Sequence, residues 1–112
     1  MKLITAVIQP HKLDEVKTAL KAVAVRGLTV SEADGFGQQK GHTEVYRGAE
    51  YTVDLVAKKK VEVLAEDADV AAITAAIVEA AQSGRIGDGK IWVTPVDEVI
   101  RVRTGASGSE AL

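Results

Sequence analysis

The chain opens with an almost continuously apolar run at residues 2–9, which ends at a proline. A strand with one face in water alternates apolar and polar residues, so an unbroken apolar run predicts a strand that is buried on both faces. Directly after it, Leu13, Val16 and Leu20 recur at spacings of three and four, the period of an amphipathic helix. One helix can cover only one face of that strand. The strand therefore belongs to a sheet whose other face must also be packed against something.

The second half of the chain repeats this order. Strand-like stretches occupy residues 28–36, 51–64 and 90–96, and a helical stripe of Val70, Ile73, Ile77 and Ala80 precedes the last of them. Asp67 or Asp69 is expected to cap this helix. Gly27 and Gly84 are expected to end the two helices. Two strand-helix-strand halves predict one ferredoxin-like α+β domain over residues 1–112, with both helices on one face of a four-stranded antiparallel sheet.

The sheet face away from the helices has no cover within one chain. Stretches such as LITAVI and VEVL are apolar on both sides, and soluble monomers rarely leave large apolar patches exposed. We therefore expect a homo-oligomer in which another subunit covers this face.

Two segments lack a regular pattern. Residues 37–50 follow neither the helix nor the strand period, which predicts a long loop between the second and third strands. Loops of this length without structure of their own are usually functional. Residues 104–112 are small and polar, and are expected to form a flexible tail.

Composition restricts the kind of partner. The 112 residues are 46% apolar and 27% charged, with a net charge of −2, as in one soluble globular domain. This charge gives no overall attraction to nucleic acid or to anionic membranes, so any anion site must be built locally. The chain has no cysteine, which excludes thiolate metal sites and fits a cytoplasmic protein. No apolar run approaches the roughly 18 residues that a membrane span needs.

Residues 84–91, GRIGDGKI, nearly match the phosphate-binding loop motif, in which a glycine and four residues precede Gly-Lys-Ser/Thr. Ile91 replaces the hydroxyl residue, and the segment runs from a helix into a strand instead of the reverse, so a P-loop nucleotide hydrolase is rejected. Gly87 and Gly89 still let main-chain N–H groups approach a phosphate, and Lys90 adds a positive charge. The alternative is a helix end followed by a tight turn.

Two further basic groups could bind an anion. Residues 99–103 alternate like a strand, which would place Arg101 and Arg103 on one face, where their guanidinium groups suit phosphate oxygens. The alternative is a solvated edge strand with surface ion pairs. In the lysine run 58–60, the middle residue would point away from the other two. These groups indicate sensing of an anionic small molecule rather than catalysis.

Two long stretches, GFGQQKGHTEVYRGAEY from Gly35 and GRIGDGKIWV from Gly84, together with RVRTG near the end, resemble the PII family of nitrogen-regulatory signal-transduction proteins. The resemblance covers essentially the whole chain. It implies a compact trimer of ferredoxin-like subunits that binds ATP or ADP in the clefts between neighbours. It also implies a transducer of nitrogen, carbon and energy status and not an enzyme.

The resemblance also implies the site residues. The nucleotide site would comprise Gly35, Gly37, Gln38 and Gln39 at the base of the long loop, Gly87, Asp88, Gly89 and Lys90 in a phosphate-contacting turn, Gly27, Leu28, Thr29, Glu62 and Leu64 beside adenine and ribose, and Arg101 and Arg103 from across the subunit boundary. Mg²⁺-ATP would create the site for 2-oxoglutarate, with Gln39 on the metal and Lys58 and Gly87 beside the effector. Tyr51 is the residue that some members carry in nucleotidylated form.

The chain departs from the family pattern at two positions. Gln9 stands where lysine or arginine is usual, and Gln38 where an arginine usually meets the terminal phosphate. Each replacement removes a positive charge beside an anion, and a charged hydrogen bond is worth about 1.5–3 kcal/mol. These departures leave open a relative whose 2-oxoglutarate response is altered or lost. A second alternative, independent of them, is a slow nucleotide hydrolase that uses the same cleft, for which no general base is evident.

By resemblance, the partners would be regulatory targets contacted through the long loop. They include an ammonium channel, a nucleotidyltransferase acting on glutamine synthetase, transcription regulators and the arginine-pathway kinase. Membranes would be reached only through a membrane-protein partner, and nucleic acid is not an expected ligand.

Overall fold

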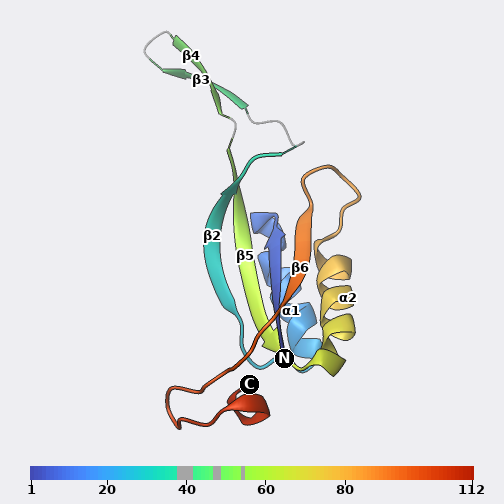
Figure 1. Cartoon of the computed structure of the whole chain (residues 1–112). Coiled ribbons are helices and arrows are strands. Elements are labelled where there is room, and N and C mark those ends of the chain that lie inside the picture. Colours follow the sequence, from blue (N-terminus) through green and yellow to red (C-terminus); the bar gives the residue numbers. More distant parts are fainter. Residues whose placement is uncertain (38–41, 47–48, 54) are drawn as a thin grey trace.

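The computed structural model describes residues 1–37, 42–46, 49–53 and 55–112 (Figure 1). Its strands are β1 (Lys2–Ile8), β2 (Thr29–Gly35), β3 (His42–Tyr46), β4 (Ala49–Val53), β5 (Val56–Ala65) and β6 (Gly89–Pro95). Its helices are α1 (Leu13–Ala22) and α2 (Val70–Ala81), with the 3-10 turns η1 (Pro10–Lys12), η2 (Asp67–Asp69) and η3 (Gly108–Ala111). Within these residues, no helix has the length and apolar character to cross a membrane.

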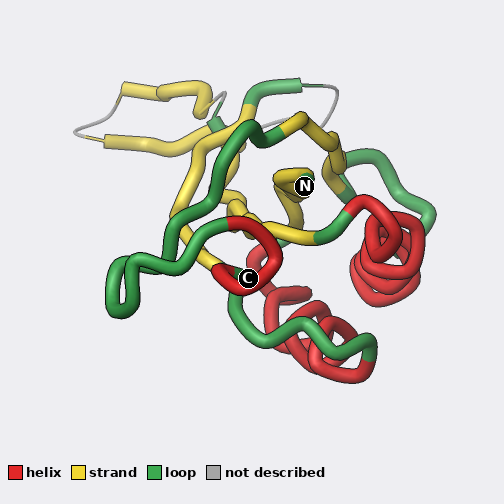
Figure 2. The backbone as a smooth tube through the Cα atoms, turned by 60° about the horizontal axis from the view of Figure 1, so that its bottom comes forward, coloured by secondary structure: helices red, strands yellow, loops and turns green. Residues whose placement is uncertain are grey.

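The main sheet has four strands in the order β2-β5-β1-β6, and each neighbouring pair is antiparallel. Both helices pack on the same face of this sheet, as Figures 1 and 2 show. The strand-helix-strand halves are therefore interleaved, with β1 and β5 at the centre of the sheet. This arrangement confirms the predicted ferredoxin-like fold.

The core lies between the helices and one face of the sheet. Its members are mostly aliphatic, and the largest fully buried ones are Ile4, Ile8, Leu20, Ile77, Val16, Val61 and Val63. Burying one such side chain contributes roughly 1.5–3 kcal/mol, more than an exposed ion pair at about 0–1 kcal/mol. The fold is therefore held by the helix stripes and by the alternate residues of β1 and β5.

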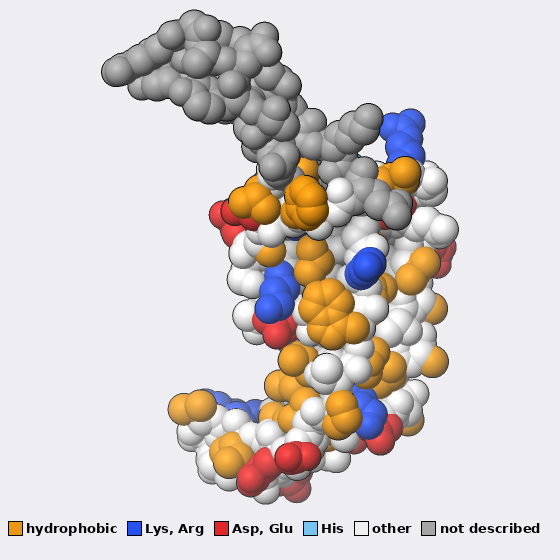
Figure 3. Space-filling model, turned by 45° about the horizontal axis from the view of Figure 1, so that its top comes forward, with side chains coloured by type: hydrophobic (Ala, Val, Ile, Leu, Met, Phe, Trp, Pro, Cys, Tyr) orange, Lys and Arg blue, Asp and Glu red, His pale blue; other side chains and the backbone are white. Residues whose placement is uncertain are grey.

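The other residues of these strands form a second face, which no helix covers and which we call the open face. The register pairs Thr5 of β1 with Glu62 of β5 and with Trp92 of β6, and residues directly opposite one another share a face. Trp92 is 45% exposed and Leu64 44%. Figure 3 shows several hydrophobic side chains exposed on the visible surface of the main body.

Helix α1 ends earlier than the sequence predicts, and its closing residue is an alanine. The main-chain N–H of Val25 donates to the carbonyl of Leu20 at 3.0 Å, and that of Ala24 donates to Lys21 at 3.1 Å. This hydrogen-bond pair places the left-handed residue at Ala24, whose φ is 64°. Gly27 was expected to fill this role and does not, since its φ is not positive.

Replacing Ala24 by glycine is expected to stabilise the protein by about 0.5–1 kcal/mol, because glycine adopts a positive φ without steric cost. Ala22→Gly, inside the last turn of α1, is the matched control and should destabilise by a similar amount. Urea unfolding of both variants measures the two changes. Equal effects of the same sign would contradict the assignment.

Helix α2 differs from expectation at both ends. Asp69 precedes it but makes no side-chain capping bond, because its φ of −94° and ψ of −10° are helical, whereas a capping side chain needs an extended backbone. The carboxylate of Asp67 instead lies 3.0 Å from the amino nitrogen of Met1. At the other end, α2 stops at Ala81, and Gly84, with a φ of 83°, belongs to the following turn.

The segment predicted as a loop without structure, residues 37–50, contains β3 and the start of β4. These two strands form an antiparallel hairpin of their own, with His42 opposite Val53. The hairpin projects beyond the end of the main sheet (Figure 1). The loop expectation was therefore wrong for the paired residues, while residues 38–41, 47–48 and 54 lie outside the described part of the chain.

Candidate functional site

The strand register brings several predicted site residues to the open face. Thr29 of β2 lies opposite Glu62 of β5, and Glu62 shares its face with Lys58, four residues away on the same strand. Lys90 of β6 lies opposite Val7, which lies opposite Lys60. Thr29, Glu62, Lys58 and Lys90 therefore share the sheet face that the helices leave uncovered.

Along this face the residues fall into two groups. Gly35, Lys58, Gly87 and Lys90 lie at the end of the sheet from which the hairpin projects, and Thr29, Glu62 and Leu64 lie toward the other end. Gly35 follows Thr29 by six residue steps along an extended strand, which corresponds to roughly 20 Å. One chain thus presents two partial sites, one at each end of the sheet.

The turn between α2 and β6 is built around the carboxylate of Asp88. This carboxylate accepts hydrogen bonds from the main-chain N–H groups of Ser83, at 2.7 Å, and Gly84, at 2.9 Å. Its second oxygen accepts a short hydrogen bond from the Ser83 hydroxyl. The side chain of Asp88 thus fixes the shape of the turn, and its predicted contact with phosphate stays a prediction.

Lowering the pH is expected to weaken this turn. The Ser83 hydroxyl and, after it, the Ser83 N–H hold the pKa of Asp88 below its ordinary value of 3.8. A depressed carboxyl pKa stabilises the fold fully above the ordinary value, and this contribution is lost as pH falls through the lower folded value. The stability difference between the wild type and Asp88→Asn in urea unfolding should therefore shrink with acidification. A difference that stays constant would contradict this role.

Lys58 connects the open face to the same turn. Its Nζ donates to the carbonyl oxygen of Gly87 at 2.6 Å, and the residue is only 8% exposed. Burial lowers the pKa of Lys58, against the opposing effect of the negative charge of Asp88. Lys59 points away, as predicted, and pairs with Glu32 at 2.8 Å. Lys58 is therefore the member of the lysine run that the fold holds beside the turn.

Two glycines permit close approach in this region. Gly87 has a φ of 98° and Gly89 a φ of 114°. A Cβ on Gly89 would overlap the carbonyl oxygen of Val7 in β1 and lie only 2.9 Å from its carbonyl carbon. Gly89 is thus required where β6 pairs with β1. The main-chain carbonyl oxygen of Gly87 accepts the hydrogen bond from Lys58.

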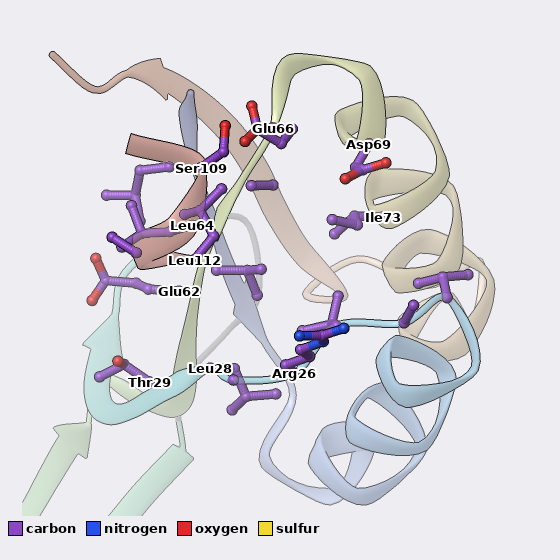
Figure 4. Close-up of a pocket in the computed structure, with 18 residues that line it drawn as sticks. Arg26, Leu28, Thr29, Glu62, Leu64, Glu66, Asp69, Ile73, Ser109 and Leu112 are labelled. Carbon is purple, nitrogen blue, oxygen red and sulfur yellow. The ribbon is translucent and has the colours of Figure 1, made fainter. Parts of the chain in front are cut away.

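At the other end of the sheet lies a cavity of about 850 Å³, shown in Figure 4. Its walls include five residues predicted to border adenine and ribose, namely Gly27, Leu28, Thr29, Glu62 and Leu64. The walls also include Glu66, whose Oε1 is buried without a hydrogen-bond partner among the residues the structure describes. An acceptor of this kind suits an N–H donor of a bound ligand.

The predicted strand containing Arg101 and Arg103 does not form. Residues 102–104 make a turn, closed by a hydrogen bond of 2.8 Å from the Gly105 N–H to the Arg101 carbonyl, and Gly105 has a φ of 70°. The two side chains therefore do not share a strand face. Arg101 is partly buried, and its Nη2 donates to the main-chain oxygen of Leu112 at 3.0 Å. Arg103 is exposed.

Several predicted positions lie outside the described residues. They are Gln38, Gln39 and the side chain of Tyr51, of which only the main chain is described, in β4 opposite Glu44. Gly37 has open space around it. Gln9 is partly buried, directly before η1.

No resident metal centre is evident in the described part of the chain, where no three His, Cys, Asp or Glu residues gather. Mg²⁺ commonly keeps several waters and binds through one or two protein ligands plus substrate phosphates. The described residues would therefore fit Mg²⁺ only as a companion of a bound phosphate.

Sequence reasoning missed many residues of these sites, and four of them illustrate why. Ser83 holds Asp88, and Glu66, Ser109 and Leu112 line the cavity. The spacing of Ser83 and Asp88 around glycines could have indicated a side-chain-closed turn. The other three have no local signal, because they meet the cavity only through the tertiary fold.

Comparison with known proteins agrees with the fold and with the predicted family. The family model for nitrogen regulatory protein P-II matches residues 1–106. The nitrogen regulatory proteins P-II of Azospirillum brasilense and of Rhizobium meliloti (strain 1021) are each 61% identical over 112 residues, which is 100% of both chains in each comparison. The crystal structure of Arabidopsis thaliana PII bound to citrate matches with a TM-score of 0.82 and 38% identity, covering 99% of this chain and 91% of that one. The chain therefore belongs to the nitrogen regulatory protein P-II family.

Proposed function

We propose that this protein is a homotrimeric sensor that binds ATP or ADP between its subunits and, with Mg²⁺-ATP, 2-oxoglutarate. Its family acts in nitrogen regulation. The observation that carries the proposal is that the predicted ligand residues of β2, β5 and β6 share the open face yet form two partial sites at opposite ends of the sheet. A second copy of the chain could supply the missing half of each.

The open face also supports the trimer. Trp92 and Leu64 are nearly half exposed there, and Thr5 is buried between its strand neighbours. A neighbouring subunit that covered this face would bury the apolar side chains. It would also bring the 850 Å³ cavity of one chain, which we call the adenine-side cavity, toward the turn at residues 84–90 of the next chain.

The chemistry of the turn favours an anionic effector. Lys58 brings a positive charge to the carbonyl of Gly87, and Lys90 adds another on the same face. A relative with 38% identity is described as bound to citrate, which is also a carboxylate. In the proposed complex, Mg²⁺ would sit on the phosphates with help from Gln39, and Lys58 would bind a carboxylate of 2-oxoglutarate.

The output of the sensor would be carried by the hairpin segment, with Tyr51 as its site of covalent modification. The hairpin projects away from the main sheet (Figure 1), where a regulatory target could contact it. The proposed targets are an ammonium channel, a nucleotidyltransferase and transcription regulators in the cytoplasm. Capture of targets from cell extract, with and without ATP plus 2-oxoglutarate, tests this output separately from ligand binding.

Titration calorimetry of the purified protein with ATP, ADP and 2-oxoglutarate tests the binding function, and light scattering tests the trimer. We expect ATP and ADP to bind alone and 2-oxoglutarate to bind only in the presence of Mg²⁺ and ATP. Failure of both nucleotides to bind would overturn the proposal. Nucleotide binding without any 2-oxoglutarate binding would favour the relative with a lost effector, for which Gln9 and Gln38 are the candidate causes.

A slow hydrolase is the second candidate, and the geometry argues against it. The carboxylate of Asp88 is the acid nearest the turn, and hydrogen bonds from Ser83 and Gly84 occupy it, so it is poorly placed to act as a general base. Steady phosphate release that disappears in Lys90→Ala would favour this candidate.

A further inference from the structure

The residues after β6 fold back on themselves and reach the adenine-side cavity. The main-chain N–H of Arg101 donates to the Ala106 carbonyl at 2.8 Å, and that of Gly108 donates to Val99 at 3.0 Å. Ile100 and Ser107 form an antiparallel bridge between the two arms. These contacts direct η3 and the residue after it, together residues 108–112, back toward the sheet. We call this segment the tail.

The tail forms one wall of the cavity. Ser109, Ala111 and Leu112 line it, and Figure 4 shows Ser109 and Leu112 on the same side as Glu62 and Leu64. The main-chain oxygen of Leu112 accepts the hydrogen bond from the Arg101 guanidinium in a partly buried position. Residues 104–112, which include the tail, were expected to be flexible, but Leu112 has a specific partner.

That partner is a residue predicted to bind phosphate. A guanidinium group offers its N–H donors in a fixed fork that suits phosphate oxygens, and charge-assisted bonds to phosphate are about twice as strong as neutral ones. The carbonyl oxygen of Leu112 occupies one arm of that fork. A bound phosphate and the tail therefore compete for the same side chain.

We propose that the tail is an internal competitor for Arg101, so that a phosphate-bearing nucleotide binds fully only after Leu112 releases the guanidinium group. This inference rests on the proposed nucleotide-binding function. A site that is available for only part of the time binds with an affinity reduced by that fraction. The tail would thereby set the nucleotide affinity of the sensor without contacting 2-oxoglutarate.

The test compares ATP affinity, by calorimetry, for the full chain and for a chain that ends at Ser107. We expect the shortened chain to bind about 3- to 10-fold more tightly. The same deletion in an Arg101→Ala background should leave affinity unchanged, which closes a double-mutant cycle. Val102→Ser is the matched control, because Val102 is 97% exposed beside Arg101 and its affinity should equal that of the wild type.

A second measurement uses the full chain, in case the shortened one does not fold. Amide hydrogen exchange of Gly108 and Leu112 should become faster when ATP is added. Unchanged or weaker binding by the shortened chain, or slower exchange of the tail with ATP, would overturn the inference alone. Absence of ATP binding to both chains would overturn the proposed function and this inference with it.

Discussion

Replacing Gly89 by alanine is expected to destabilise the protein by more than roughly 4 kcal/mol, in the range reached only by severe steric or packing defects. The added Cβ would overlap the Val7 carbonyl oxygen, and the φ of 114° is itself unfavourable for any residue with a side chain. Neither strand can retreat cheaply, because β1 also pairs with β5 at the centre of the sheet. Urea unfolding followed by the fluorescence of Trp92, the single tryptophan, measures the change.

Gly27→Ala is the matched control. A Cβ on Gly27 would meet no atom within 4 Å, and the φ of Gly27 is not positive, so this substitution should be neutral or stabilise by up to about 1 kcal/mol. Both glycines belong to the predicted nucleotide site, but the backbone requires glycine only at position 89. A Gly89→Ala protein as stable as Gly27→Ala would show that β1 and β6 do not approach as described.

Replacing Lys58 by methionine is expected to weaken 2-oxoglutarate binding by about 10- to 150-fold while the fold is retained. Loss of a charged hydrogen bond costs about 1.5–3 kcal/mol, which gives this range. Methionine fills a similar volume without a desolvated charge, so stability should change little or rise. Calorimetry in Mg²⁺-ATP measures the affinity, and ATP binding alone should be nearly unaffected.

Lys59→Met is the control for this substitution. Lys59 lies on the opposite face and pairs with Glu32 at the surface, so 2-oxoglutarate affinity should not change, and stability should fall by no more than about 1 kcal/mol. Equal losses of affinity in the two variants would contradict the assignment of Lys58 to the effector.

The pKa of Lys58 gives this pair of variants a pH signature. Burial lowers the folded pKa below the ordinary value of 10.5, so the unfolded chain holds more protons than the folded one in that range. Stability from this group therefore rises with pH through the lowered pKa and levels off above the ordinary value. As the pH becomes alkaline, the free energy of unfolding of the wild type should rise relative to that of Lys58→Met. The difference between the wild type and Lys59→Met, measured over the same pH range, serves as the reference.

The spacing of apolar residues predicted the sheet and the helices, because each element buries one face and its apolar residues therefore recur with the period of that element. The alternate residues Ile4, Ala6 and Ile8 lie in the core, and the same period separated Lys58 from Lys59. The hairpin was missed because HTEVY does not alternate regularly, and because AEYTV, which does alternate, was assigned from Tyr51 onward to the strand that follows it. Residues 99–103 misled for the opposite reason. Their alternation resembles a strand, yet Val102 is 97% exposed, so no buried face selects that conformation.

The candidate site was predictable where family motifs are local, and less so where contacts are long-range. The turn at residues 84–90 follows from its glycines and charges. The bond between Arg101 and Leu112 joins a side chain to a main-chain oxygen across a folded-back segment, and no spacing rule encodes it. The left-handed residue after α1 is likewise set by two main-chain hydrogen bonds, which hold Ala24 at a positive φ that alanine does not favour.

The antiparallel pairing of β2 with β5 limits how the gene can change in length. Thr29 lies opposite Glu62 and Ala33 opposite Lys58, so inserting or deleting a single codon between Lys58 and Glu62 would turn one of them to the helix side. Deep mutational libraries should therefore reject length changes within β5 even where they accept most substitutions.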